Sequence, residues 1–252
     1  MADLLRVENL AKRFGGIVAT DDLVLDLRDG ELHAIIGPNG AGKTTLIAQL
    51  SGQLSPDSGR IYFAGNDITG IPMYARSALG LARSFQITSL FLDLSVLDNV
   101  ALAVQAHAGH SFHFWRNARR EPELRDPARA ALARVGLEGR ANLPASALSH
   151  GEHRQLELAM ALASRPRMLL LDEPMAGLGP EESTRMVAML RELKKELTIL
   201  LVEHDMEAVF ALADRITVLV YGRVIASGKP DDIRSNTQVR DAYLGEQEAS
   251  RG

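Results

Sequence analysis

The sequence predicts an α/β fold in which helices cover a mostly parallel β-sheet and a helical subdomain is inserted into the sheet domain. Three observations support this fold class. Short apolar segments with the length of buried strands alternate with helical segments. A glycine-rich turn separates one of these strands from the helix that follows it. Between about residues 87–164, alanine becomes frequent, β-branched runs disappear and helix signals dominate.

The expected strands and helices can be placed in chain order. A buried strand at 31–36 precedes the glycine-rich turn, and a helix is expected from about Gly42 to Leu50. A further strand, 60–64, is bounded by Gly59 and Gly65. The later segments predict strands at 168–171, 198–202, 215–220 and 223–226 and helices at 180–196 and 206–212, with Tyr221-Gly222 as the turn between the last two strands. We therefore divide the single domain 1–252 into a core (1–86 and 165–230), a helical subdomain (87–164) and a C-terminal helix and tail (231–252).

Composition excludes several classes of protein. With 252 residues, 46% of them hydrophobic and 24% charged, the chain can bury a sizeable core. The absence of cysteine excludes disulfides, Cys-ligated zinc and iron–sulfur clusters. A net charge of -4 argues against nucleic acid as the main partner. The start of the chain, Met1–Val7, lacks the features of a signal peptide, and no apolar run is long enough to span a bilayer, so we expect any action at a membrane to go through a partner.

The glycine-rich turn matches a phosphate-binding motif. All eight positions of Gly37-Pro38-Asn39-Gly40-Ala41-Gly42-Lys43-Thr44 fit G-x-x-x-x-G-K-[ST], between a strand and a helix. Backbone N–H groups of such a loop surround the phosphates of a nucleotide, and the helix that follows adds its positive N-terminal end. We expect Lys43 to reach the β- and γ-phosphates, the Thr44 hydroxyl to bind Mg²⁺, and Thr45 to complete the site. A glycine-rich turn that only starts a helix is the alternative, and the complete match disfavours it.

Two adjacent acids follow the apolar run at 168–171. Asp172 and Glu173 stand at the carboxyl end of this strand, where ligands of open α/β sheets bind. Asp172 suits binding of Mg²⁺ through a water molecule, and Glu173 suits a base that activates the attacking water. No Asn-Lys-x-Asp segment for guanine recognition is found. In isolation the pair could be two solvated acids, but downstream of a complete phosphate loop the catalytic interpretation is favoured.

The segment Leu148-Ser149-His150-Gly151-Glu152, upstream of the acidic pair, resembles the LSGGQ signature of the ATP-binding-cassette (ABC) ATPases. His150 replaces the usual Gly and Glu152 the usual Gln. Ser149 and Glu152 also form an S-x-x-E capping box, which by itself predicts a helix from here to about Ser164. A capped helix start still offers N–H groups to an anion, so both interpretations can hold.

This resemblance covers nearly the whole chain. It implies a P-loop NTPase (RecA-like) core with a mostly parallel sheet, an antiparallel β subdomain and the inserted α-helical subdomain, and it implies ATP and Mg²⁺ as ligands. Cassettes of this family meet head to tail, so Ser149 and Gly151 of one chain are expected on the γ-phosphate held by a second ATP-binding subunit, which is either another copy or a paralogue.

Three further positions carry over from the family, and a fourth departs from it. Gln86 in Ala82-Arg83-Ser84-Phe85-Gln86 corresponds to a glutamine that contacts Mg²⁺ or the water, although a Gln alone is uninformative. His204 corresponds to the switch histidine on the γ-phosphate, although a lone His after a strand is more often a surface residue. Phe14 fits the aromatic on which adenine stacks, with an N-terminal core aromatic as its alternative. Gly179 stands where the family often has Asp, which puts communication between the two ATP sites in doubt.

Finer resemblance suggests what the cassette drives. The segments around 82–86, 112–116 and 202–206 and the end 239–246 resemble ATP-binding subunits of bacterial importers for branched-chain (hydrophobic) amino acids. The implied partners are integral-membrane permease subunits and, indirectly, a periplasmic binding protein, with the chain at the cytoplasmic face of the inner membrane. Relatives for urea, short amides or lipopolysaccharide export, and a regulatory cassette outside transport, remain alternatives.

The sequence leaves the role of one histidine-rich segment undecided. His107, His110 and His113 are spaced as zinc ligands could be, but no carboxylate or second motif accompanies them. Over zinc binding we favour an amphipathic surface near a membrane partner or anionic lipid, which includes Phe112, Phe114, Trp115, Arg116, Arg119 and Arg120. A solvated basic helix is the alternative of equal weight.

Overall fold

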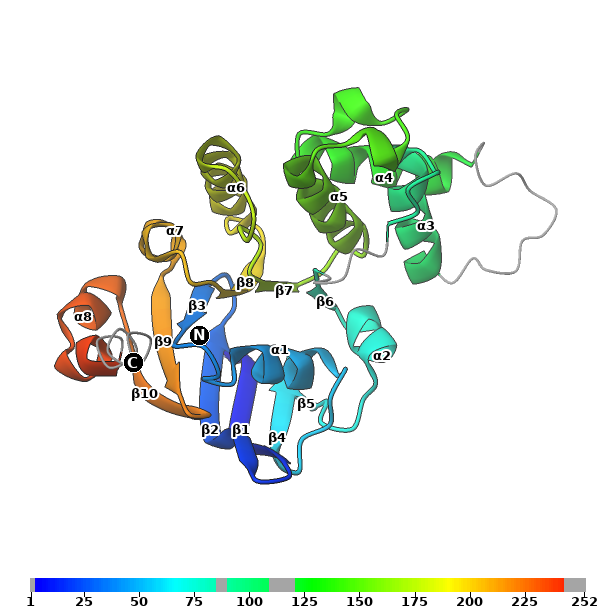
Figure 1. The fold of residues 1–252 in the computed structure, drawn as a ribbon. Helices are drawn as coiled ribbons and strands as arrows, with labels where there is room; N and C mark the ends of the chain where they lie inside the picture. Colours follow the sequence, from blue (N-terminus) through cyan, green and yellow to red (C-terminus); the bar gives the residue numbers. More distant parts are fainter. Residues whose placement is uncertain (1–2, 85–89, 109–120, 243–252) are drawn as a thin grey trace.

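A computed structural model describes residues 3–84, 90–108 and 121–242 of the chain. It has the predicted α/β architecture, with one mostly parallel sheet and one antiparallel sheet (Figure 1). The first sheet has the order β10-β9-β3-β8-β7-β6, in which only the β9–β10 pairing is antiparallel among the strands described. Its strands are β3 (Leu32–Ile36), β6 (Leu81–Arg83), β7 (Met168–Asp172), β8 (Thr198–Val202), β9 (Arg215–Val220) and β10 (Arg223–Gly228).

Both faces of the parallel strands are buried, which explains why their sequences are continuously apolar. Along β7, Leu169 and Leu171 join one core cluster while Met168 and Leu170 join another. The second cluster contains α1 (Lys43–Ser51), which lies between the two sheets (Figure 1). On the other face lie α6 (Pro180–Leu193) and α7 (Met206–Leu212). Helix α6 ends three residues before the predicted Glu196, in a turn that leads into β8.

The antiparallel sheet has the order β2-β1-β4-β5, with β1 at Asp3–Phe14, β2 at Ile17–Arg28, β4 at Ser58–Phe63 and β5 at Asn66–Asp67. Of these four strands, only β4 corresponds to a strand that the sequence predicts, at 60–64. The β1–β2 pairing contains several register shifts, and Asn9 and Asp22 adopt positive φ angles of 49° and 50°. Such bulges break the alternation of apolar and polar residues by which a strand is recognised in a sequence.

The helices of the inserted region pack against one another beside the sheet edge formed by β6 and β7 (Figure 1). They are α3 (Val96–Ala108), α4 (Pro122–Arg134) and α5 (His150–Ala163), with short 3-10 turns η2 (Glu138–Arg140) and η3 (Ala145–Ala147). All of them lie within the expected 87–164 segment. The short helix α2 (Met73–Ala78) precedes β6, and α8 (Pro230–Ser235) follows β10. Among the residues described, no helix has the length and apolarity that crossing a membrane requires.

Candidate functional site

The phosphate loop connects the carboxyl end of β3 to the start of α1. Helix α1 begins at Lys43, its N-cap is Gly42, and no side chain caps its first turn. Gly42 has a φ of 98°, and a Cβ there would lie 2.0 Å from the carbonyl oxygen of Ala19 in β2. Only glycine fits this position, because the φ angle is positive and there is no room for a Cβ. The sharp turn at Gly42 leaves the N–H groups of the helix start available to an anion. The predicted loop residues from Gly37 to Thr45 are therefore continuous with an uncapped helix N-terminus.

Two backbone carbonyl groups of the phosphate loop hold the side chain of Lys43 over the loop. Its Nζ donates to the carbonyl oxygens of Gly37 at 2.6 Å and Pro38 at 2.9 Å. The residue is buried, whereas Thr44 is exposed and Thr45 is half-buried. The structure thus brings a cation and two hydroxyl groups to the same helix turn, as the motif predicts.

The acidic pair stands at the same edge of the sheet as the phosphate loop, because β3, β8 and β7 are parallel. Asp172 ends β7 and its side chain is 1% exposed. Its Oδ2 accepts a hydrogen bond from Nη2 of Arg83 at 3.1 Å, while Oδ1 has no partner among the described residues. Burial raises the pKa of Asp172, and the positive charges of Arg83 and Lys43 oppose that rise. A buried carboxylate with one free oxygen beside the phosphate loop fits a hard cation such as Mg²⁺.

Glu173 and His204 come together after β7 and β8. Glu173 has a φ of 50°, in the left-handed region that a non-glycine residue adopts at a cost of roughly 1–3 kcal/mol. Its N–H donates to the carbonyl oxygen of Val202 at 2.9 Å, which fixes the turn. The Nδ1 atom of His204 lies 3.9 Å from Oε1 of Glu173, and its side chain is 65% exposed. Both side chains are accessible to a ligand.

Glu203 is a site residue for which sequence analysis gave no role. It is 1% exposed, and its Oε1 accepts the N–H of Met175 at 2.8 Å. Its Oε2 accepts the N–H groups of His204 at 3.0 Å and Asp205 at 3.4 Å. The carboxylate therefore joins the loop after β7 to the loop after β8. The only signal in the sequence is an acid directly after a buried apolar strand.

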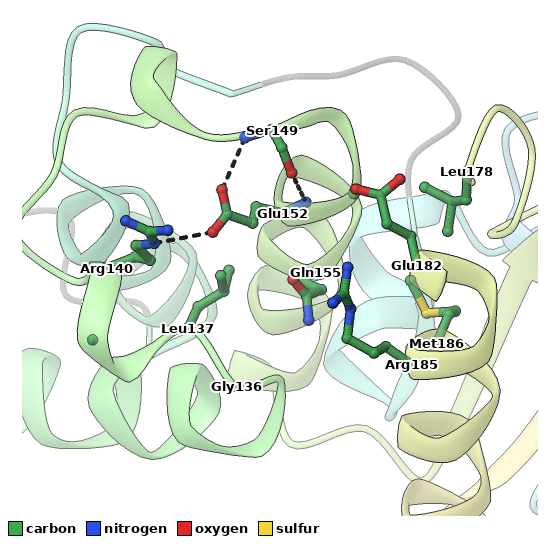
Figure 2. Close-up of a pocket in the computed structure, with 12 residues that line it drawn as sticks. Gly136, Leu137, Arg140, Ser149, Glu152, Gln155, Leu178, Glu182, Arg185 and Met186 are labelled. Carbon is green, nitrogen blue, oxygen red and sulfur yellow. Dashed lines mark hydrogen bonds and ion pairs between the residues drawn. The ribbon is translucent and has the colours of Figure 1, made fainter. Parts of the chain in front are cut away.

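The signature segment starts α5. Ser149 Oγ accepts the N–H of Glu152 at 3.2 Å, and Glu152 Oε2 accepts the N–H of Ser149 at 2.9 Å, so the predicted capping box is confirmed. This helix start borders a cavity of about 560 Å³ that is also lined by Glu182, Arg185 and Met186 of α6. Figure 2 shows Gln155 of α5 beside Arg185, while Glu152 points toward Arg140, whose Nε donates to its Oε1 at 3.0 Å. A Cβ at Gly151 would lie 2.4 Å from Oε1 of Glu182.

The remaining predicted residues are placed as follows. Phe14 ends β1 and is 49% exposed, so the alternative of a core aromatic is wrong. The Nζ of Lys12 lies 5.7 Å from the centre of its ring. Gly179 caps α6, and its N–H donates to Oε2 of Glu182 at 3.2 Å. Gln86 and the segment 109–120 lie outside the described residues, while His107 is exposed near the end of α3.

Comparison with known protein families and structures agrees with this geometry. Residues 20–176 match the model of the ABC transporter family, and residues 223–249 match that of the branched-chain amino acid ATP-binding cassette transporter. The chain is 39% identical to the high-affinity branched-chain amino acid transport ATP-binding protein LivG of Salmonella typhimurium, over 96% of this chain and 98% of LivG. It is 38% identical to BraF of Pseudomonas aeruginosa, which has the same description, over 96% of this chain and 98% of BraF.

Solved structures give the same result. An ATP-binding cassette of an ABC transporter in its ADP conformation superimposes with a TM-score of 0.86 at 30% identity, covering 97% of this chain and 100% of that one. A dimeric cassette bound to ADP and Pi after hydrolysis has a TM-score of 0.75 at 26% identity, covering 90% and 98%. A phosphate loop, an acidic pair and a signature segment, each placed by its own strand or helix, are thus combined in one cassette, and the chain belongs to the ABC transporter ATPase family.

Proposed function

We propose that this chain is the ATP-hydrolysing subunit of an importer for branched-chain or other hydrophobic amino acids. The observation that carries the proposal is the pairing of Glu173 with His204 at the edge of the sheet that also holds the phosphate loop. The substrate class rests on the relatives, which are described as branched-chain amino acid transport proteins and match this chain over almost its whole length. The match of residues 223–249 supports the same class.

The described residues suggest how hydrolysis proceeds. Lys43 and the N–H groups of the loop hold the phosphates, and Phe14 provides an exposed ring for adenine. Thr44, Asp172 and Gln86 would hold Mg²⁺, which neutralises charge on the phosphates when it is bound. Glu173 accepts a proton from the attacking water, and His204 contacts the γ-phosphate.

A second cassette completes the site. None of the residues that line the cavity at the signature segment belongs to the phosphate loop. Ser149 and Gly151 therefore act, in this proposal, on the nucleotide of a second ATP-binding subunit, which is either another copy of this chain or a paralogue. Glu182 of α6 borders the same helix start and is expected to move with that contact.

We expect the permease subunits to contact the chain where the helical subdomain meets the core. A cavity of about 600 Å³ lies at this junction, between α2 with β6 and α3 with α5. Apolar side chains dominate its border, among them the exposed Met73, Tyr74, Phe91 and Leu102. Exposed apolar residues gathered in this way favour a protein partner. We assign this surface to integral-membrane permease subunits and place the chain at the cytoplasmic face of a bacterial inner membrane. A periplasmic binding protein would supply the substrate, and we expect no nucleic-acid partner.

The variant Glu173→Gln tests the catalytic assignment. We expect it to bind ATP, to accumulate as a closed dimer in light scattering, and to lose at least ~10²-fold of its ATPase turnover, the scale of removing a catalytic base. Glu196→Gln, which changes an exposed acid paired with Arg134, is the control and should retain turnover. Unchanged turnover in Glu173→Gln would remove this residue from the role of base.

Uptake distinguishes the candidate functions. The permeases that co-purify with the chain, reconstituted in vesicles with their binding protein, should take up radiolabelled leucine when ATP is present. Uptake of urea or a short amide instead would assign one of the alternative substrates. Recovery of a soluble complex without a membrane protein would favour a regulatory cassette.

A further inference from the structure

An arginine of the segment 82–86, for which the sequence predicted no role, holds the carboxylate that we assign to the metal. Arg83 is the last residue of β6, next to β7 in the parallel sheet. Its side chain is 9% exposed, and its Nη2 donates to Oδ2 of Asp172 at 3.1 Å. Nη1 donates to Oε1 of Gln53 at 2.6 Å and to Oγ of Ser51 at 3.4 Å, while Nε has no partner among the described residues. Arg83 thus bridges the end of β7 and the segment that follows α1.

A second arginine shows that this pairing is selective. Arg154 of α5 and Asp172 both border a small cavity of about 10 Å³. Arg154 donates to Glu157 of its own helix at 3.1 Å. Among the described residues, Arg83 is therefore the one hydrogen-bond partner that the structure places on the Asp172 carboxylate.

We propose that Arg83 is a positioning residue that orients Asp172 for the divalent cation of the bound nucleotide. Its guanidinium holds Oδ2, so the carboxylate plane is fixed and Oδ1 is left for the cation or its water. Groups that orient a ligating carboxylate in this way contribute roughly 10–100-fold to metal affinity. We expect the lower end of this range, because Asp172 is assigned to the metal through water. This inference rests on the proposed function, in which Asp172 serves Mg²⁺.

The positive charge of Arg83, considered alone, predicts the opposite change in metal affinity. A guanidinium near the cation repels it, so a purely electrostatic role would make the metal bind more tightly once Arg83 is removed. Orientation predicts weaker binding. The direction of the change therefore decides between the two roles.

The effect of Arg83 on metal binding is isolated by measuring nucleotide affinity with and without the metal. The dissociation constant of a non-hydrolysable ATP analogue is determined by calorimetry, once in EDTA and once in saturating Mg²⁺, and the ratio of the two gives the coupling between metal and nucleotide. For Arg83→Gln we expect the EDTA value to stay within about twofold of the wild type. The coupling ratio should fall about tenfold, which corresponds to about 1.4 kcal/mol.

Two variants serve as controls. Arg83→Lys keeps the charge but loses the two-sided bridge, and it should recover part of the coupling. Arg167→Gln removes an exposed arginine–aspartate pair, to Asp29 at 3.2 Å, at the start of β7 and so at the opposite end of that strand from Asp172. It should leave the coupling unchanged. Thermal unfolding of each variant without ligand shows that it is folded.

The outcomes separate the two proposals. A wild-type chain whose analogue affinity does not respond to Mg²⁺ would overturn the metal assignment and with it this inference. If the wild type responds and Arg83→Gln responds equally or more strongly, the positioning role is wrong while the proposed function stands. A coupling in Arg83→Lys that lies between those of the wild type and Arg83→Gln would support positioning by charge-assisted contact.

Discussion

Replacing Arg76 with Met should destabilise the chain more than any surface substitution. Arg76 lies in α2, is 1% exposed and donates to four backbone carbonyl oxygens. Two of these, of Gln49 and Leu50 at 2.8 and 2.7 Å, belong to the last turn of α1. The other two, of Ile71 at 2.7 Å and Thr69 at 3.0 Å, belong to the loop before α2. The guanidinium therefore caps the helix that begins at the phosphate loop.

The magnitude follows from these four bonds. Methionine occupies a similar volume but leaves the carbonyl oxygens of Leu50, Thr69 and Ile71 without a donor among the described residues, while that of Gln49 still accepts the N–H of Gly52 at 3.2 Å. Each lost bond has a net cost of roughly 1 kcal/mol. Burial opposes the charge of Arg76, since it lowers its pKa to about 10, so part of the gain from the bonds is already offset in the native chain. We expect a loss of about 3 kcal/mol, and a melting temperature lower by roughly 6–12 °C for a chain of this size.

Circular dichroism or calorimetry of the ligand-free protein measures this shift. Arg60→Met is the control, because Arg60 forms only an exposed pair with Asp67 at 3.3 Å and should cost less than about 1 kcal/mol. Arg76→Lys should lie between the two, since one ammonium cannot reach four carbonyls in the same geometry. A melting temperature of Arg76→Met within about 2 °C of the wild type would show that water or neighbouring donors replace the guanidinium.

Two smaller predictions follow from single hydrogen-bonded groups. His33 is fully buried, and burial lowers its pKa, so the folded chain keeps it neutral while the unfolded chain is protonated below its ordinary pKa. The free energy of unfolding should therefore fall as pH decreases from about 7.5 through 6.5 to 5.5. In urea unfolding, this free energy should depend less on pH in His33→Gln than in the wild type. Equal slopes of free energy against pH in the two proteins would exclude His33 as the cause. Ser149→Ala removes half of the capping box and should cost about 1 kcal/mol, while Ser146→Ala should be neutral; equal melting temperatures of the two variants would mean that Glu152 alone caps α5.

The parallel core and the motif residues could be predicted because their signals are local. Strands buried on both faces are continuously apolar, and the phosphate loop, acidic pair and signature are each a single continuous segment. The bulged pair β1–β2 and the three-residue β6 gave no such signal. The bulges disturb the period of two, and three residues are too few to show one.

The polar contacts between distant segments could not be predicted. Arg83 and Asp172 are 89 residues apart in the chain, and Arg76 and Gln49 are 27 apart. The sequence around an arginine does not indicate which carbonyl or carboxylate group it will contact, because only the tertiary fold brings these distant groups together. Glu203 is similar: only the positions of β7 and β8 side by side explain why one carboxylate serves the N–H groups of Met175 and His204.

The segment 173–182 links the two halves of the expected site within one chain. It starts at Glu173, whose backbone is held in the left-handed region beside β8, and it continues to Met175, whose N–H is held by Glu203. It ends at Glu182, which accepts the N–H of Gly179 and borders Gly151 in the signature helix. In the proposed dimer, a displacement of the signature by a second cassette would reach the carboxylate that we assign to catalysis through this short tethered segment. Gly179, where an Asp is usual, leaves this path intact, because the backbone N–H rather than a side chain makes the contact with Glu182.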